Sequence, residues 1–203
     1  MAPPPIFYFA PGSSSMATHI ALHEVGAAFD GVPMSFHRKD GQRPDYLALN
    51  PEGKVPTLLI DGRPLTEVAG ILWYLARAYP EAQLIPAGDP EAEAHVVSWM
   101  SFIASTVHPA RRQGLEHAMG VYRLADQRLG ERDWAAGDYS IADIHLFRLY
   151  WRFAGSLNPP AGAFPHLQAH HDRMMARPAV IRAIEAEAAV GYELPGQGAP
   201  ERS

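Results

Sequence analysis

Hydrophobic and polar positions follow two different periods in the first part of the chain. Residues 6–9, Ile-Phe-Tyr-Phe, are typical of a short strand. Apolar residues then recur at three- and four-residue spacing, which predicts a helix: they are Ala17, Ile20, Ala21, Val25 and Ala28. Val32, Met34 and Phe36 alternate with other residues, which predicts a second, half-buried strand. The order strand, helix, strand favours a βαβ unit whose two strands are parallel.

A hairpin and another helix follow this unit. Residues 57–60 and 63–66 flank Asp61-Gly62, a dipeptide that favours the tight turn of a two-residue hairpin. The next apolar positions have helical spacing, and Pro80 ends the helix: they are Val68, Ile71, Leu72, Leu75 and Tyr79. Residues 38–49 read as a surface connector with one helical turn at 45–47. The pattern up to residue 80 is therefore βαβ-ββα.

The rest of the chain has only helical periodicity. Prolines and a glycine crowd residues 79–90, so we expect a linker at 81–90 between a domain at 1–80 and a helical domain at 91–190. Expected helices cover 96–107, broken at Pro109, then 119–129, 164–175 and 180–189. Ser140-Ile141-Ala142-Asp143 fits a capping box at the start of one more helix. Residues 191–203 are rich in glycine and proline, and we expect a loose tail.

Composition narrows the classes of function. The chain has 203 residues, 47% of them hydrophobic, and a formal net charge of -5. We expect a globular protein with no nucleic-acid partner and no membrane partner, since there is no long basic cluster and no transmembrane run. The first residues do not resemble a secretory signal, so we expect a cytoplasmic protein. Because the chain has no cysteine, thiol–disulfide exchange through a protein thiolate is excluded.

One proline stands where a strand begins. Pro56 has no N–H to donate to a sheet, so it belongs at a strand's first residue or at an edge. The residue before it, Val55, then keeps backbone groups that are free to bind a peptide-like ligand.

Several motifs together resemble the cytosolic glutathione transferase family. Residues 50–56, Asn-Pro-Glu-Gly-Lys-Val-Pro, with 65–67, Leu-Thr-Glu, look like the glutathione-binding segment of that family, and the box at 140–143 looks like its helix cap. The loop at 8–17 is most similar to the bacterial beta class, which ordinarily has a cysteine where this chain has Ser14. The resemblance covers about residues 6–189. It implies a thioredoxin-like α/β N-terminal domain and an all-α C-terminal domain.

The resemblance also implies how glutathione would be bound as co-substrate. Pro56 would be cis, and the backbone of Val55 would pair with the cysteinyl part of glutathione. Glu67 would bind the γ-glutamyl ammonium and the N–H of Val68 its carboxylate, with Lys39 and Lys54 near the glycyl end. The alternatives are a structural proline, an acid that favours a helix start, and two solvated lysines. Many relatives have a hydroxyl residue at the position of Val68, so this site has one fewer donor.

The reaction would need the glutathione thiol as a thiolate. Lowering a thiol pKa of about 8.5 by two units requires about 2.7 kcal/mol, whereas a helix N-terminus supplies only about 0.3–1 kcal/mol. A hydroxyl donor adds about 1.5–3 kcal/mol, so one is needed. Our candidates are Ser14 first, then Ser15, then Tyr8. The alternatives are an ordinary helix cap for the serines and a strand aromatic for Tyr8.

Other candidate residues lie in the helical part. His108 matches a histidine that faces the thiol in beta-class relatives, although a histidine at a helix end is often only a cap. Four aromatic residues could line a pocket for an apolar co-substrate or belong to the core: Trp99, Phe102, Tyr150 and Trp151. His166, His170 and His171 could share a helix face, but no acid or cysteine accompanies them, so we expect no metal site. The short segment 108–140 predicts a shallow, open electrophile site.

We therefore expect a glutathione transferase that acts on a small apolar electrophile. A glutathione peroxidase or ether-cleaving reaction is compatible with the same residues. The alternatives are a non-catalytic binding or assembly module with this fold, and a storage protein for flat apolar ligands. The resemblance implies a homodimer.

Overall fold

The computed structural model describes residues 3–193 and contains one mixed four-stranded sheet in the order β2-β1-β3-β4. Strand β1 (Ile6–Phe9) pairs in parallel with β2 (Asp30–Pro33) and antiparallel with β3 (Thr57–Ile60). Strand β4 (Arg63–Thr66) completes the hairpin with β3. Helix α1 (Ser15–Glu24) connects β1 to β2. The predicted βαβ-ββα order is confirmed.

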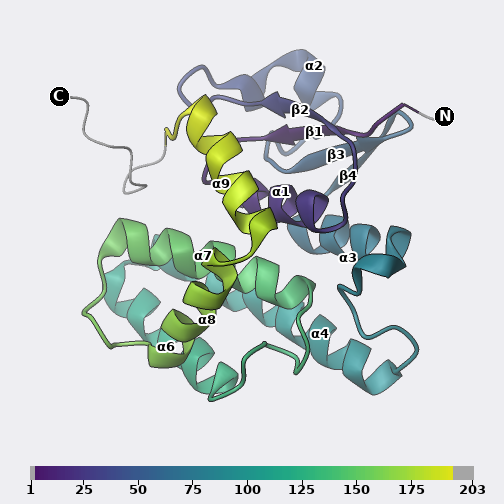
Figure 1. Cartoon of the computed structure of the whole chain (residues 1–203). Coiled ribbons are helices and arrows are strands. Elements are labelled where there is room, and N and C mark those ends of the chain that lie inside the picture. The colour runs from purple at the N-terminus through teal and green to yellow at the C-terminus, as the bar shows by residue number, and fades with distance from the viewer. Residues whose placement is uncertain (1–2, 194–203) are drawn as a thin grey trace.

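Helices lie on both sides of this sheet (Figure 1). Helices α1 and α3 (Val68–Ala78) lie between the sheet and the helical part of the molecule, whereas the short α2 (Pro44–Leu47) lies on the opposite side. Every residue of α1 from Ser15 to Leu22 is buried, because this helix also contacts α7 and α9. Two short 3₁₀ turns, Asp40–Gln42 and Pro80–Ala82, lie in the connections before α2 and after α3.

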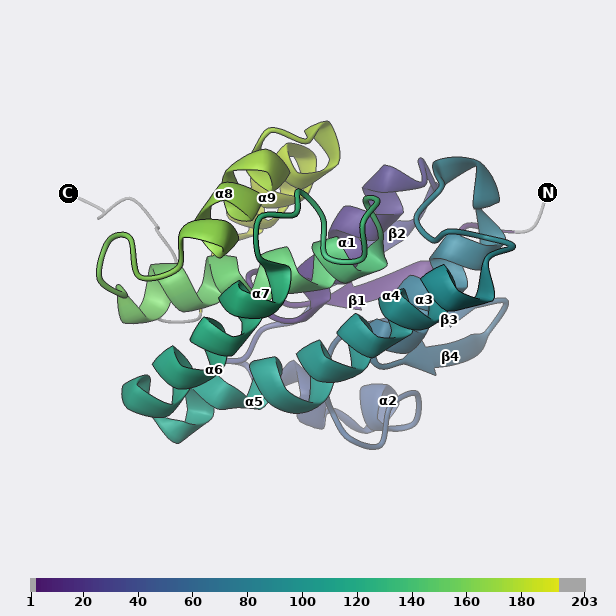
Figure 2. The ribbon, with the colours of Figure 1, turned by 90° about the horizontal axis from the view of Figure 1, so that it is seen from below.

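From Pro90 to Val190 the chain forms helices and their connections, as predicted. Below the sheet in Figure 1, and therefore on the viewer's side of it in Figure 2, lie α4 (Pro90–Phe102), α6 (Leu115–Leu129) and α7 (Ile141–Leu157). Helices α8 (Pro165–Met175) and α9 (Pro178–Val190) return the chain to the first part, where α9 packs on α1. No helix within residues 3–193 is both long enough and apolar enough to span a bilayer.

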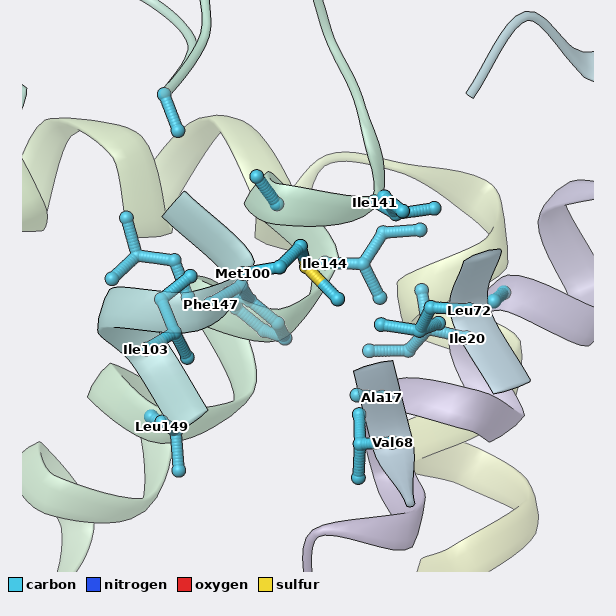
Figure 3. Close-up of a cluster of buried hydrophobic side chains, with 14 of the residues drawn as sticks. Ala17, Ile20, Val68, Leu72, Met100, Ile103, Ile141, Ile144, Phe147 and Leu149 are labelled. Carbon is cyan, nitrogen blue, oxygen red and sulfur yellow. The ribbon is translucent and has the colours of Figure 1, made fainter. Parts of the chain in front are cut away.

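Most buried hydrophobic residues of the two parts form one cluster (Figure 3), and Ala10, Met34 and Tyr46 form a small second one. Ile20 of α1, Leu72 of α3, Met100 of α4 and Ile144 of α7 all belong to it. The two parts therefore share a core, so their relative position is fixed by apolar burial. The boundary at residues 81–90 stays a prediction.

The second strand ends earlier than the alternating pattern predicts. β2 stops at Pro33, and although Met34 is buried, Phe36 is 45% exposed. Pro33 has no N–H, so the ladder cannot continue regularly beyond it, and only Met34 adds one further bond, to Phe9. The prediction of a strand reaching Phe36 was wrong.

The helix that begins at Pro90 does not break at Pro109. After α4 it continues as a π-helical turn, Ile103–Val107, and then as α5 (His108–Ala110) and a 3₁₀ turn, Arg111–Gln113. A proline in a regular α-helix loses its hydrogen bond and clashes with the carbonyl four residues earlier, and a wider π turn relieves this conflict. The helix therefore carries His108 and the residues after it toward the first part of the molecule.

The capping box is confirmed at the start of α7. Ser140 and Asp143 cap each other's backbone, and Asp143 also accepts hydrogen bonds from the N–H of Ala135 (2.7 Å) and pairs with His170 (3.0 Å). At the other end of the chain, Glu193 accepts bonds from the N–H of Phe36 and from neighbouring groups. The expected loose tail is thus held at its beginning, and residues 194–203 lie outside the described residues.

Candidate functional site

Two adjoining cavities lie where the first part of the chain meets helices α5 and α7. The first, of about 270 Å³, is lined by Glu67 and Val68, and we call it the Glu67 pocket. The second, of about 310 Å³, is lined by four arginines and is called the arginine pocket; they are Arg111, Arg112, Arg148 and Arg152. The two cavities share Ser14, Lys54, Val55, His108 and Arg112. They are therefore two ends of one continuous site.

Ser14 lies at the junction of these pockets. It precedes α1 and is partly exposed, whereas Ser13 and Ser15 are buried. Its Oγ donates to the carbonyl of Val55 at 3.1 Å. Within the loop 12–17, the N–H of Ser14 is the one that has no acceptor among the described residues. Ser14 thus presents a hydroxyl and a free N–H at the start of a ten-residue helix.

Ser15 does not reach the site. It is fully buried, and its Oγ bonds to both the N–H and the carbonyl of Ala10 at 3.1 Å. Ser13 and Ser15 also share a hydrogen bond between their hydroxyls at 2.7 Å. These bonds fix the loop, so the alternative of a structural serine holds for Ser15, and its candidacy as thiol activator was wrong.

Tyr8 is also outside the site. Its ring packs against that of Tyr46, with ring centres 5.3 Å apart, and lines a separate hollow beside β2 and α2. Side chains alternate between the faces of a strand, and the register of β1 turns Tyr8 toward this hollow, away from Ser14. The alternative reading of Tyr8 as a strand aromatic is the one the structure supports.

The loop before β3 presents Val55 to both pockets. The Val55–Pro56 peptide bond is cis, as the resemblance implies. The N–H of Val55 has no partner among the described residues, although its carbonyl accepts the bond from Ser14. Gly53 has a φ of +63°, and a Cβ added to it would lie 2.6 Å from the carbonyl oxygen of Gly41. Only glycine fits there, and this close approach of two loops positions Val55.

Glu67 and Val68 lie where α3 begins. Glu67 is exposed and has the unusual dihedral angles φ 65° and ψ 125°, a conformation that costs free energy and often marks a functional site. Its carboxylate has no hydrogen bond or ion pair within residues 3–193. The side chain of Val68 is buried in the core cluster (Figure 3), so only its backbone N–H at the helix start is available. A free carboxylate and a free N–H are thus adjacent.

The two lysines differ in position. Lys54 lines both pockets and forms an exposed ion pair with Glu52 at 2.5 Å. Lys39 is exposed and lines a smaller neighbouring hollow, which shares Gly53 and Val55 with the site. The structure brings Lys54 to the site and leaves Lys39 beside it.

Two histidines face the Glu67 pocket. Burial, with the charge of Arg148 as the next cause, lowers the pKa of His108 to about 4. Burial also lowers the pKa of His145 to about 3, and neither ring nitrogen of this residue has a partner within the described chain. Both rings are therefore neutral at neutral pH. His108 was predicted from the resemblance, whereas His145 was missed.

The four arginines were also missed. Arg148 is buried, and its Nε and Nη2 donate to the carbonyls of Ser13 and Gly12 at 2.7 and 2.9 Å. Arg152 lies one helical turn later, and Arg111 with Arg112 follows His108 in the other wall. The signals in the sequence were the adjacent Arg111 and Arg112 and the four-residue spacing of Arg148 and Arg152 in α7. Because the chain is acidic overall, a local group of cations favours the binding of an anion.

The aromatic residues considered as pocket walls belong to the core. Trp99 is 3% exposed and packs edge-on against Phe102. Tyr150 is buried and bonds to Gln168, and Trp151 packs against Tyr192. None of these four lines either pocket. Of the two readings left open by the sequence, a place in the core is the one that the structure supports.

The histidines of α8 have structural partners. His170 is buried and bonds to Asp143 of the capping box, and His171 bonds to Asp172 at 3.2 Å. Within residues 3–193, no group of three or more histidine and acidic residues is arranged to hold a metal ion.

Residues 4–77 match the model of the glutathione S-transferase N-terminal domain, and residues 71–178 match that of its C-terminal domain. The glutathione S-transferase GstA of Escherichia coli O157:H7 is 32% identical over 200 residues, covering 89% of this chain and 97% of that protein.

Solved structures of transferases have the same fold. A sphingomonad glutathione S-transferase complexed with glutathione has a TM-score of 0.81 at 32% identity, over 90% of this chain and 98% of that one. A bacterial beta-class glutathione S-transferase from Sphingomonas chungbukensis has a TM-score of 0.78 at 32% identity, with the same coverage. The expected thioredoxin-like domain followed by a helical domain is confirmed. The chain belongs to the cytosolic glutathione transferase family.

Proposed function

We propose that the protein is a glutathione-dependent transferase that binds reduced glutathione in the Glu67 pocket and activates its thiol at Ser14. One observation carries the assignment of the thiol: among the three candidate hydroxyls, only that of Ser14 lies at the junction of the two pockets. The family and its transferase relatives favour the enzyme over a non-catalytic module.

The Glu67 pocket suits the charges of the tripeptide. The unpaired carboxylate of Glu67 binds the γ-glutamyl ammonium, and the N–H of Val68 at the helix start binds the adjacent carboxylate. The free N–H of Val55 pairs with the cysteinyl residue, as in the addition of an extended strand. Lys54 and Arg112, which line both pockets, bind the glycyl carboxylate.

Glutathione bound in this way brings its sulfur to Ser14. In the free protein the hydroxyl donates to Val55, so it must exchange a neutral hydrogen bond, worth about 0.5–1.5 kcal/mol, for a bond to a thiolate, worth about 1.5–3 kcal/mol. The exchange is favourable but falls short of the roughly 2.7 kcal/mol needed to lower the thiol pKa by two units. The free N–H of Ser14 and the start of α1 supply a further contribution.

Arg148 supplies the remaining positive charge. Its guanidinium donates to the carbonyls of Ser13 and Gly12, directly behind the serine loop, and it carries no carboxylate partner within the described residues. A buried cation acts through a low effective dielectric, so its field favours an anion at Ser14. His108 is neutral in this site, so it acts as a hydrogen-bonding group and not as a second cation.

The thiolate then attacks an electrophilic carbon. The sulfur electron pair forms the carbon–sulfur bond, and the leaving group departs with the electrons of the bond that breaks. The arginine pocket adjoins Ser14 and has the volume for a small co-substrate. Its lining does not favour the purely apolar electrophile that we expected. A homodimer and a cytoplasmic location stay part of the proposal.

The test is a calorimetric titration with reduced glutathione, followed by turnover of 1-chloro-2,4-dinitrobenzene, a general electrophile. We expect saturable binding below millimolar concentration and enzyme-dependent loss of chloride from the aryl ring. An absence of binding at millimolar glutathione overturns the proposal. Binding without turnover of any electrophile favours the non-catalytic module instead.

A further inference from the structure

The arginine pocket is lined by a group of positively charged residues. Its wall holds Arg111, Arg112, Arg148, Arg152 and Lys54, and no aspartate or glutamate of residues 3–193 lines it. Within residues 3–193, none of the four arginines forms an ion pair with a carboxylate. Lys54 alone is paired, with Glu52. The formal charge of the whole chain is -5, so most of the charged residues outside this pocket are acidic.

Arg152 differs from the other residues of this group because its unpaired nitrogens are buried. It is 2% exposed, and its Nε and Nη1 are buried and make no hydrogen bond within the described chain. Arg148 differs, because two of its nitrogens donate to backbone carbonyls. Arg152 and Arg148 each have a pKa lowered to about 10 by burial, so both are still charged at neutral pH. A buried, charged group without a partner is unfavourable and calls for an explanation.

The position of the arginine pocket explains the unpaired charge of Arg152. It adjoins Ser14 on the side away from Glu67, where the second substrate of the proposed reaction must approach the sulfur. Its remaining wall includes the apolar surfaces of Phe36, Tyr122 and Leu149. Such a cavity fits a small molecule that has an apolar body and an anionic end. The planar guanidinium of arginine binds carboxylates through two parallel hydrogen bonds.

We propose that the electrophilic co-substrate carries a carboxylate, which Arg152 and its neighbour Arg111 bind in the arginine pocket while the reacting carbon faces Ser14. This inference rests on the proposed function and names the substrate class of the same site. The carboxylate takes no part in the bond changes. The thiolate forms the carbon–sulfur bond, and the leaving group departs with its electron pair.

Two electrophiles that differ in one charge test the inference. 4-Chloro-3,5-dinitrobenzoate and its methyl ester both lose chloride to glutathione, and each rate is divided by the uncatalysed rate with glutathione alone. We expect kcat/KM of the acid, so corrected, to exceed that of the ester by about tenfold or more in the unaltered protein.

Three variants test whether Arg152 causes the preference for the acid over the ester. Arg152→Met keeps the length of the side chain and removes the charge, and we expect it to abolish the preference, mainly through a KM for the acid that is about tenfold higher. Arg152→Lys restores the charge and part of the preference. Arg123→Met removes a charge from the exposed face of α6, outside both pockets, and keeps the full preference. If Arg152→Met does not fold, Arg111→Met in the same wall takes its place.

The outcomes separate this inference from the function on which it rests. Equal corrected rates for acid and ester in the unaltered protein overturn the inference while leaving the transferase in place. A tenfold loss of affinity for S-methylglutathione in Arg152→Met also overturns it, because the arginines then belong to the glutathione site. An absence of glutathione binding, with neither electrophile turned over, instead overturns the proposed function and the inference with it.

Discussion

The hydroxyl of Ser14 donates a hydrogen bond to the carbonyl of Val55 at 3.1 Å, which joins the start of helix α1 to the loop before β3. Both residues line both pockets. The hydroxyl proposed to stabilise the thiolate is therefore held, in the free protein, next to the backbone proposed to bind the cysteinyl residue. Binding and activation of glutathione are coupled through these two residues.

Replacing Ser14 by alanine should affect the thiol more than binding. Because one donor to the thiolate is lost, we expect the thiol pKa of bound glutathione to rise by about one to two units, with a corresponding fall in kcat/KM at neutral pH. The ultraviolet absorbance of the thiolate as a function of pH measures this pKa. Affinity for S-methylglutathione, which has no thiol, should change by less than about threefold.

Ser101→Ala is the matched control for that variant. Ser101 lies exposed on α4, lines neither pocket, and should leave the thiol pKa unchanged. If the thiol pKa is unaltered in Ser14→Ala, the hydroxyl does not activate the thiol, and only the backbone N–H and Arg148 do.

Replacing Ser14 by cysteine tests the position of the sulfur independently of catalysis. A thiol at this junction should attack oxidised glutathione, form a mixed disulfide with one half and release the other half as a thiolate. Intact-protein mass spectrometry should show one glutathionyl group that is removed by a reductant. Ser101→Cys, an exposed thiol outside the pockets, should react much more slowly. Equal rates for the two cysteines would show that position 14 is not beside the bound sulfur.

Glu67 should determine the affinity for glutathione. Glu67→Gln removes the charge opposite the γ-glutamyl ammonium and keeps the shape, so we expect the dissociation constant to rise by about 10- to 100-fold, as for a lost charged hydrogen bond. Calorimetry measures this directly. Glu81→Gln, at an exposed acid between α3 and α4, serves as control and should bind like the unaltered protein. The proposed orientation of glutathione fails if both variants bind equally well.

The sequence predicted those features that local patterns determine. The hairpin follows from Asp61-Gly62 between residues 57–60 and 63–66, and the cap of α7 follows from Ser140 and Asp143. Helix α3 follows from the spacing of its buried residues. In each case the residues that decide the structure are neighbours in the chain. The π turn before Pro109 was not predicted. It depends on how the helix accommodates the steric clash of this proline while both helix ends are held by packing.

The site could be predicted only in part for the same reason. Three adjacent serines are equivalent in sequence, and only the turn of the backbone separates Ser14 from the buried Ser15. Likewise, the sequence shows that Arg152 lies on a helix but not that no acid of another helix meets it. The resemblance supplied the glutathione-binding segment, whereas the charge of the second pocket needed three-dimensional contacts.

Stability should fall as the pH is lowered through the range in which three buried or partly buried histidines bind protons. Burial lowers the pKa of His23 and of His108 to about 4, and that of His145 to about 3, from an ordinary value of 6.5. Below about pH 6.5 the unfolded chain therefore binds more protons than the folded protein, and the free energy of unfolding decreases by up to about 1.4 kcal/mol per pH unit for each histidine. Urea unfolding between pH 7 and 4 measures the slope.

His23→Phe isolates one of these histidines outside the glutathione site. It keeps a ring beside His19 and Phe29 and should reduce the slope. Phe29→Leu is the control: it removes ring contacts of the same cluster without a titrating group, so it should lower stability equally at each pH. A slope that is the same in His23→Phe as in the unaltered protein would contradict the prediction.

Arg152 should reduce the stability of the free protein, because its buried Nε and Nη1 have no partner within the described chain. Arg152→Met removes the unpaired charge and fills similar space, so we expect the free energy of unfolding to increase by about 1–3 kcal/mol, seen as a higher urea midpoint. Arg128 offers the opposite case: it stacks on Trp99 at 4.5 Å and bonds to Ser98. Arg128→Met should therefore lower the midpoint. If Arg152→Met lowers it as well, Arg152 has a structural partner, and the stability argument for an anion in the arginine pocket fails.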